Sequence, residues 1–135
     1  MNKQRGVTLL ELLIVIVVIG ILVAVAYPSY TQQVQRTKRA ECAGGLVQMA
    51  SAMERDLSQN NTYSDIVGGG LFTDACPIDG GTATYDLTVQ AFTASTYTLR
   101  ATPVGGQVND ACGWLQLTNT GLKTAQNGTV DTCWR

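Results

Sequence analysis

Apolar residues fill the first part of the chain almost without interruption. From Leu12 to Ala26 only Gly20 breaks a run of apolar side chains, and Val7 to Leu10 extend that run at its start. The combined stretch reaches the roughly 20 residues that an α-helix needs to cross the hydrocarbon layer of a bilayer. The pattern therefore predicts an N-terminal helix that lies in a membrane or an apolar bundle.

Beyond this run the pattern becomes amphipathic. Pro28 is expected to kink or interrupt the helix near Tyr27. After it, apolar residues recur at helical spacing with charged residues between them: Tyr30, Val34, Leu46, Met49, Ala50, Met53 and Leu57. The prediction is a helix from about residue 7 to about residue 57, on the order of 75 Å long. Its second half would pack on a head domain, with Met49 and Met53 in the core.

Three basic residues follow closely on one another in this second half. Arg36, Lys38 and Arg39 lie where the helix would leave the apolar layer. We interpret them as a solvated or interface-flanking patch rather than as a ligand site.

The rest of the chain changes to the period of β-strands. Residues 58–77 are rich in asparagine and glycine and predict a loop. Alternation over Thr84–Ala91 and Ser95–Thr102 predicts two strands, and residues 113–118 and 122–125 predict two short ones joined by the Asn119–Gly121 turn. Three or four antiparallel strands packed on one long helix make an α+β fold.

The charge balance and the cysteines bound the chemistry. Among the 135 residues there is no histidine, and beyond Asp56 three basic side chains face six acidic ones. A head this acidic is a poor general binder of phosphate backbones. Four cysteines without a C-x-x-C pair favour two disulfides in an oxidising compartment over a zinc site. Three pairings are possible; we favour Cys42–Cys76 and Cys112–Cys133, each stabilising by about 3 kcal/mol.

One charged residue, Glu11, stands inside the apolar run. A carboxylate there costs roughly 2.5–3.5 kcal/mol on insertion scales, so a partner is expected. A secretory signal peptide cut after Ala26 would have a shorter apolar region without an acid. A plain membrane anchor explains the length of the run but leaves Glu11 unpaired.

The residues around Glu11 follow a local order. A short leader with Lys3 and Arg5 ends at Gly6, and the sequence continues as Val-Thr-Leu-Leu-Glu before the apolar run resumes. This order resembles the type IV pilin and pseudopilin family, whose leader is cut after a glycine and whose acid stands at the fifth mature position. Val7 stands where the family usually has phenylalanine.

The resemblance implies a set of processing and assembly roles. Prepilin peptidase would cut between Gly6 and Val7, the amine of Val7 would be methylated, and Glu11 would meet the terminal amine of a neighbouring subunit in a filament. Two charges in a low-dielectric interior are costly apart and tolerable together. Thr8 is read either as a local hydrogen-bonding residue or as a small polar residue that a helix tolerates.

The resemblance also implies an organisation of the chain. Residues 1–6 would be the cleaved leader, 7–28 the transmembrane or filament-core helix, 29–57 the amphipathic half, and 58–135 the β-sheet head. This is the pilin fold, and Cys112–Cys133 would bound its C-terminal loop. The chain would sit in the bacterial inner membrane with its head in the periplasm, and then in the extracellular pilus.

The function that follows is assembly, not catalysis. The "GWLQLTNTGLKT" segment and the four cysteines are most similar to a PilE-type type IVa minor pilin, which would prime or join a pilus that supports twitching motility, adhesion or DNA uptake. Expected partners are other pilins, prepilin peptidase, the inner-membrane assembly platform and lipid. No cofactor or metal is expected, and nucleic acid is unlikely to bind. The alternatives are a type II secretion pseudopilin and a DNA-receptor pilin, for which only Arg100, Lys123 and Arg135 would supply positive charge.

Overall fold

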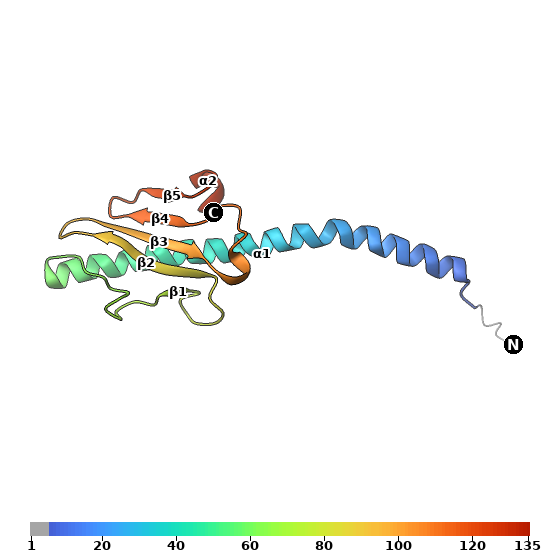
Figure 1. Cartoon of the computed structure of the whole chain (residues 1–135), viewed down its shortest axis with the longest axis horizontal. Coiled ribbons are helices and arrows are strands. Elements are labelled where there is room, and N and C mark those ends of the chain that lie inside the picture. Colours follow the sequence, from blue (N-terminus) through green and yellow to red (C-terminus); the bar gives the residue numbers. More distant parts are fainter. Residues whose placement is uncertain (1–5) are drawn as a thin grey trace. The chain divides into compact units, whose positions relative to one another are not determined.

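The computed structural model describes residues 6–135, which divide into two compact units at the Val34–Gln35 bond. Helix α1 (Leu9–Asn60) begins in the first unit and ends in the second. The elements that follow are β1 (Ala75–Cys76), β2 (Tyr85–Phe92), β3 (Tyr97–Pro103), the 3-10 turn η1 (Gly105–Gln107), β4 (Leu115–Thr118), β5 (Lys123–Ala125) and α2 (Val130–Cys133) (Figure 1).

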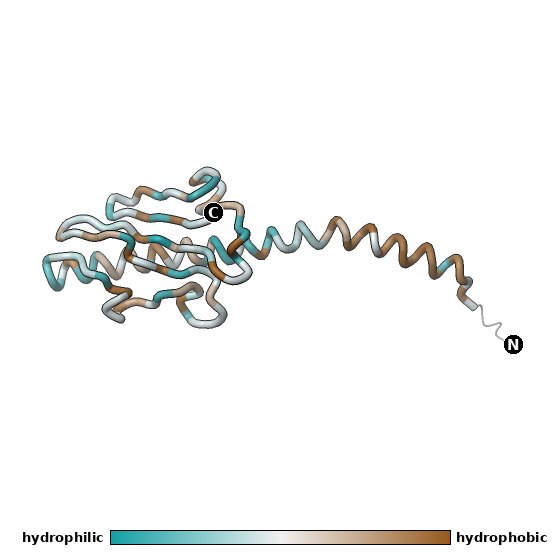
Figure 2. The backbone as a smooth tube through the Cα atoms, viewed as in Figure 1, coloured by the Kyte–Doolittle hydropathy of each residue, from teal (hydrophilic) through white to brown (hydrophobic). Residues whose placement is uncertain are grey.

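The first unit is mostly an apolar helix whose side chains are exposed. Every residue from 6 to 30 is exposed, including the valines, leucines and isoleucines of the apolar run. Figure 2 shows this part of α1 as an almost unbroken hydrophobic stretch. By length and composition it is able to cross a membrane.

Pro28 does not interrupt α1, so the predicted combined helix is continuous, and of the two predicted effects of Pro28, a kink or an interruption, the interruption is absent. The helix continues through residues 27–30, and the Pro28 carbonyl accepts a hydrogen bond from Thr31 Oγ1 at 2.9 Å. Proline removes one backbone donor and crowds the preceding turn. Intact turns on both sides hold the helix together across this single missing bond.

The second unit contains a five-stranded antiparallel sheet in the order β1-β2-β3-β4-β5, so consecutive strands are neighbours throughout. The predicted strands are present with shifted ends. The predicted three or four strands become five because Ala75–Cys76 pairs with Tyr85–Asp86. A two-residue strand carries no alternation that a sequence pattern could reveal.

The core lies between the second half of α1 and one face of the sheet. In both β3 and β4, buried and partly exposed residues alternate, so one face packs inward and the other faces solvent. The fully buried side chains come from both layers: Leu46, Met49 and Met53 from α1, and Tyr85, Leu87, Leu99 and Leu115 from the strands.

Two disulfides tie the head together. Cys42 on α1 is joined to Cys76 on β1, with Cα atoms 5.6 Å apart, and Cys112 is joined to Cys133 with Cα atoms 5.8 Å apart. These are the two pairs that the sequence analysis favoured. Next to the first, Gly45 lets the chain approach closely, because a Cβ there would lie 3.1 Å from Cys76 Sγ.

Candidate functional site

The start of α1 brings together the residues on which the sequence resemblance rests. Gly6 and Val7 precede the helix, and both are exposed; the leader through Arg5 lies outside the described residues. Glu11 N donates to Thr8 Oγ1 at 3.2 Å, and Thr8 N donates to Glu11 Oε2 at 3.5 Å. This reciprocal pair is a capping box, in which two side chains satisfy orphan donors at a helix start.

The capping box changes the interpretation of both residues. Of the two interpretations of Thr8, a local hydrogen-bonding residue or a small polar residue that a helix tolerates, the structure supports the first. Thr-x-x-Glu at the start of an apolar run is the sequence signature of a capping box, and it was missed because Glu11 was considered only for its charge.

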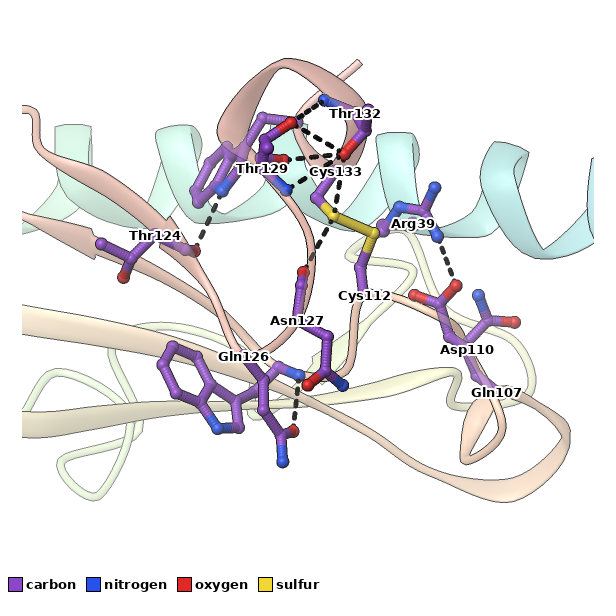
Figure 3. The surroundings of a disulfide bond; sticks show 12 residues. Arg39, Gln107, Asp110, Cys112, Thr124, Gln126, Asn127, Thr129, Thr132 and Cys133 are labelled. Atoms are coloured by element: carbon purple, nitrogen blue, oxygen red, sulfur yellow. Dashed lines mark hydrogen bonds and ion pairs between the residues drawn. A yellow bond between two sulfur atoms is a disulfide. The ribbon is translucent and has the colours of Figure 1, made fainter.

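A network of buried polar side chains joins α1 to β2 and to the segment around η1. Arg39 forms an ion pair with Asp110, and both side chains are at most 5% exposed. Tyr85 Oη donates to Asp110 Oδ2 at 2.8 Å, while Gln107 Nε2 donates to the Gln35 carbonyl at 2.7 Å and to Tyr85 Oη at 3.3 Å (Figure 3 shows Arg39, Asp110 and Gln107). Burial raises the pKa of Tyr85, which keeps the phenol protonated as a donor.

The interpretation of Arg39 as part of a solvated patch was therefore wrong. Arg36 is exposed and Lys38 is partly exposed, but Arg39 turns into the head. Its partner Asp110 lies far along the chain, in a segment without periodicity. No local pattern could have identified a pair of this kind.

A second polar network of the head, partly exposed, centres on Glu54 and two tyrosines. Tyr63 Oη donates to Glu54 Oε1 at 3.0 Å and Tyr97 Oη donates to the same atom at 3.1 Å, and the two rings meet edge to face. Burial raises the pKa of both phenols. The contacts hold the far end of α1 to β3.

Two cations of the head lie over tryptophan rings. The Arg100 guanidinium is 4.7 Å from the centre of the Trp114 ring, and Lys123 Nζ is 5.2 Å from that of Trp134. Such contacts hold a cation electrostatically over the ring face. Trp134 is itself fixed, because its Nε1 donates to the Thr124 carbonyl at 3.0 Å.

The C-terminal segment that carries Trp134 is held by its own contacts. Thr129 caps α2, its hydroxyl accepting from Thr132 N at 3.3 Å while Thr132 Oγ1 accepts from Thr129 N at 3.2 Å. The Cys112–Cys133 disulfide joins this turn to the segment before β4 (Figure 3). The sequence analysis did not predict α2, although Thr129 and Thr132 supply a weak version of a capping signal.

The strand register shows where the two stacked cations lie. Arg100 pairs with Gln116, which pairs with Thr124, so all three lie on the solvent face of the sheet. Lys123 pairs with Leu117 and therefore lies on the opposite side, at the open edge of β5. With neighbouring strands about 4.8 Å apart, Arg100 and Lys123 are separated by roughly 10 Å across the sheet.

Charge is segregated within the head. Residues 57–86 carry four aspartates and no lysine or arginine, whereas residues 87–135 carry Arg100, Lys123 and Arg135. Of the two aspartates in the latter segment, Asp110 is neutralised by Arg39, which leaves Asp131. We call the three basic residues the cationic edge. The head total of three basic and six acidic residues concealed this separation.

Within residues 6–135, no group of three or more histidine, cysteine, aspartate or glutamate side chains is placed to hold a metal ion. All four cysteines are disulfide-bonded.

Comparison with solved structures supports the fold. A type IV pilin from Shewanella oneidensis aligns with a TM-score of 0.51 at 22% identity, covering 75% of this chain and 98% of that one. The non-core minor pilin PilV of Neisseria meningitidis aligns with a TM-score of 0.54 at 21% identity, covering 76% and 95%. The pilin fold predicted from the sequence is thereby confirmed.

Sequence comparison identifies relatives of the chain in addition to its fold. Fimbrial protein Q of Moraxella bovis is 34% identical over 125 residues, which cover 81% of this chain and 74% of that protein. The type IV major pilin PilA of Myxococcus xanthus is 38% identical over 63 residues, but these span only 29% of its length.

Two family models match adjoining parts of the chain. The prokaryotic N-terminal methylation motif matches residues 1–27. The model described as type IV minor pilin ComP, DNA uptake sequence receptor, matches residues 28–116. The second match covers most of the head and confirms the prediction of a minor pilin: the chain belongs to the ComP family of type IV minor pilins.

Proposed function

We propose that this minor pilin joins a type IV pilus through its apolar helix segment, and that its head binds double-stranded DNA. The first part rests on the exposed apolar run of the N-terminal unit. A buried valine, leucine or isoleucine stabilises by about 1.5–3 kcal/mol relative to an exposed one. A run of this length therefore needs an apolar partner from outside the chain, which is lipid before assembly and the helices of other pilins afterwards.

Processing would prepare the segment for assembly. Prepilin peptidase would cut between Gly6 and Val7, and the new amine of Val7 would be methylated. In the filament that amine would lie against Glu11 of a neighbouring subunit. Among residues 6–135, only Thr8 N bonds the Glu11 carboxylate, at a long 3.5 Å, so the carboxylate retains capacity for a stronger partner.

The cellular route follows from the same proposal. The head would stay in the periplasm while the helix spans the inner membrane, and the assembly platform would then move the subunit into the extracellular pilus. A type II secretion pseudopilin is the alternative, because core protein G of Pectobacterium carotovorum is 33% identical over 61 residues. That similarity covers 45% of this chain, whereas the minor pilin model extends from residue 28 to residue 116.

Sheared filaments would test the assembly proposal. We expect the incorporated chain to begin at Val7 and to be one methyl group heavier than its sequence, as determined by intact mass and N-terminal sequencing. Glu11→Gln keeps the size of the side chain but removes its charge, and we expect at least a tenfold loss of incorporation. Glu41→Gln, an exposed residue on α1, is the matched control. Normal incorporation of Glu11→Gln would contradict the charge-pairing role.

The DNA-binding part of the proposal is carried by the cationic edge. The family model is described as a DNA uptake sequence receptor, and the three head cations all lie in residues 87–135, with Asp86 of β2 the acidic residue that shares the exposed sheet face with Arg100. Two of these cations are held over indole rings. Cations held in place bind phosphate and base edges with less loss of side-chain freedom. Residues 87–135 alone carry three basic and two acidic side chains, so the acidic total of the head does not describe this part of the chain.

Fluorescence anisotropy would test DNA binding with the full chain in non-ionic detergent and a labelled 12-base-pair duplex. Three cations predict a slope of log K against log salt of at most about −2.7. Lys123→Gln together with Arg135→Gln should weaken binding and make the slope shallower by up to about 1.8. Arg55→Gln on α1 serves as the control. No binding at low salt would contradict a DNA-binding head.

A further inference from the structure

We infer that two residues of the cationic edge have different roles in DNA binding: Arg100 reads a guanine, and Lys123 contacts the phosphate backbone. This inference rests on the proposed DNA binding and adds which residue of this chain determines sequence preference. It starts from the different ways in which the two cations are held.

The Arg100 guanidinium is fixed in position on two sides. Its plane lies over Trp114, with Cζ 4.7 Å from the ring centre. The Gln116 side-chain oxygen, in the amide orientation that satisfies both groups, accepts from Nη2 at 2.9 Å and from Nε at 3.2 Å. Because Gln116 is the cross-strand partner of Arg100, the sheet register itself sets this contact.

These contacts leave the terminal fork of the guanidinium available. Gln116 takes the Nε side, so the N–H groups of Nη1 and Nη2 that point along the end of the side chain remain free among the described residues. The Gln116 oxygen faces the arginine, which directs its NH₂ group away. The free end of the guanidinium therefore presents donors only.

A group that carries hydrogen-bond donors and no acceptors binds the edge of a base that presents acceptors. In the major groove guanine shows two adjacent acceptors, N7 and O6, whereas adenine and cytosine each show an amino donor. A guanidinium fork matches the guanine pair, and this is the commonest specific arginine contact with DNA. Lys123 presents a compact charge with rotating donors, which suits phosphate but does not fix a base.

The experiment compares the sequences that the full chain selects from a random 12-base-pair duplex library. Wild-type protein in non-ionic detergent should enrich at least one guanine at a fixed position. Arg100→Lys keeps the charge but loses the fork, and it should reduce that enrichment by about 5- to 100-fold while leaving the salt slope unchanged. Lys123→Gln should weaken all sequences alike and reduce the slope by about 0.9. Arg55→Lys is the matched control.

A second measurement uses unaltered protein and changes the DNA. Replacing the enriched guanine by 7-deazaguanine removes the N7 acceptor and should reproduce the effect of Arg100→Lys. If wild type binds without enriching guanine, or if Arg100→Lys weakens all duplexes equally, Arg100 contacts phosphate and the inference is wrong. If wild type binds no duplex at all, the proposed function itself fails.

Discussion

The two units of this chain handle apolar side chains in opposite ways. In the N-terminal unit residues 6–30 are all exposed, although they form the most apolar stretch of the sequence. In the head, apolar residues are less dense along the sequence and are spread over part of α1, α2 and five strands, yet Leu46, Met49 and Leu99 are completely buried. The head buries its apolar side chains within the chain, whereas those of the N-terminal unit stay exposed and are available for contacts with other molecules.

This difference separates stability from assembly. Substitutions in the head should alter the free energy of unfolding, whereas substitutions in the apolar run should leave it unchanged and act only on association. Both tryptophans of the chain lie in the head, so tryptophan fluorescence during guanidinium unfolding reports on that unit alone. The predictions below use this signal with the full chain in detergent micelles.

The largest effect is expected at the buried ion pair. Arg39→Ala would leave the Asp110 carboxylate buried without its partner, and breaking such a pair destabilises by about 3–5 kcal/mol. Arg36→Ala removes an exposed arginine from the same helix and should change the free energy of unfolding by less than about 0.5 kcal/mol. Equal effects of the two substitutions would show that Arg39 does not anchor α1 to the sheet.

A matched pair of leucines tests the contrast directly. Leu46→Ala removes a fully buried side chain and should destabilise the head by about 2–5 kcal/mol. Leu13→Ala, in the exposed apolar run, should leave the unfolding of the head unchanged. Its effect should appear in filaments instead, as a lower yield of assembled subunit. A loss of head stability in Leu13→Ala would mean that the two units are energetically coupled.

The C-terminal disulfide should contribute a similar but smaller amount to the free energy of unfolding of the head. Cys112→Ser with Cys133→Ser opens the loop that carries β4, β5 and α2, and the chain-entropy model gives a loss of about 3 kcal/mol. The same double substitution should weaken DNA binding, because Lys123 lies on this loop and Trp134, over which Lys123 is held, directly follows it. If the double variant unfolded at the same guanidinium concentration as the wild type, the expected loss of stability would be wrong.

The sequence was most informative where structure is local. The apolar run, the amphipathic half of α1 and the alternation in β2 and β3 each follow a period of a few residues, so the helix and the main strands were predicted with only their ends displaced. The order of residues from Gly6 to Glu11 was enough to identify the family.

The sequence was least informative where contacts join distant segments. Arg39 was misread because Asp110 follows it by 71 positions. The cationic edge was underestimated because formal charge was summed over the whole head, whereas its basic residues all fall in residues 87–135 and four of its six aspartates fall in residues 57–86. The stacking of Arg100 on Trp114 depends on strand register, which becomes known only once β3 and β4 are paired.

The smallest expected effect is a loss of head stability in acid that depends on Asp56. Hydrogen bonds from Ser64 Oγ at 2.6 Å and Asn60 Nδ2 at 2.7 Å hold the pKa of Asp56 below its usual value of 3.8. A carboxylate whose pKa is lowered by folding contributes stability above its unfolded pKa, and this contribution is lost as the pH falls from about 4 through the folded pKa.

Asp56→Asn should therefore flatten the dependence of unfolding on pH below about pH 4, and Ser64→Ala should flatten it part of the way. Urea unfolding between pH 2 and pH 6, followed by tryptophan fluorescence, measures this change. Glu11 is the one charged side chain of residues 7–30, and Glu11→Gln should retain the wild-type acid slope if head stability is independent of the N-terminal unit. A flatter dependence of unfolding on pH in Glu11→Gln would instead show that the charge of the N-terminal unit affects the stability of the head. The separation of assembly from stability would then be wrong.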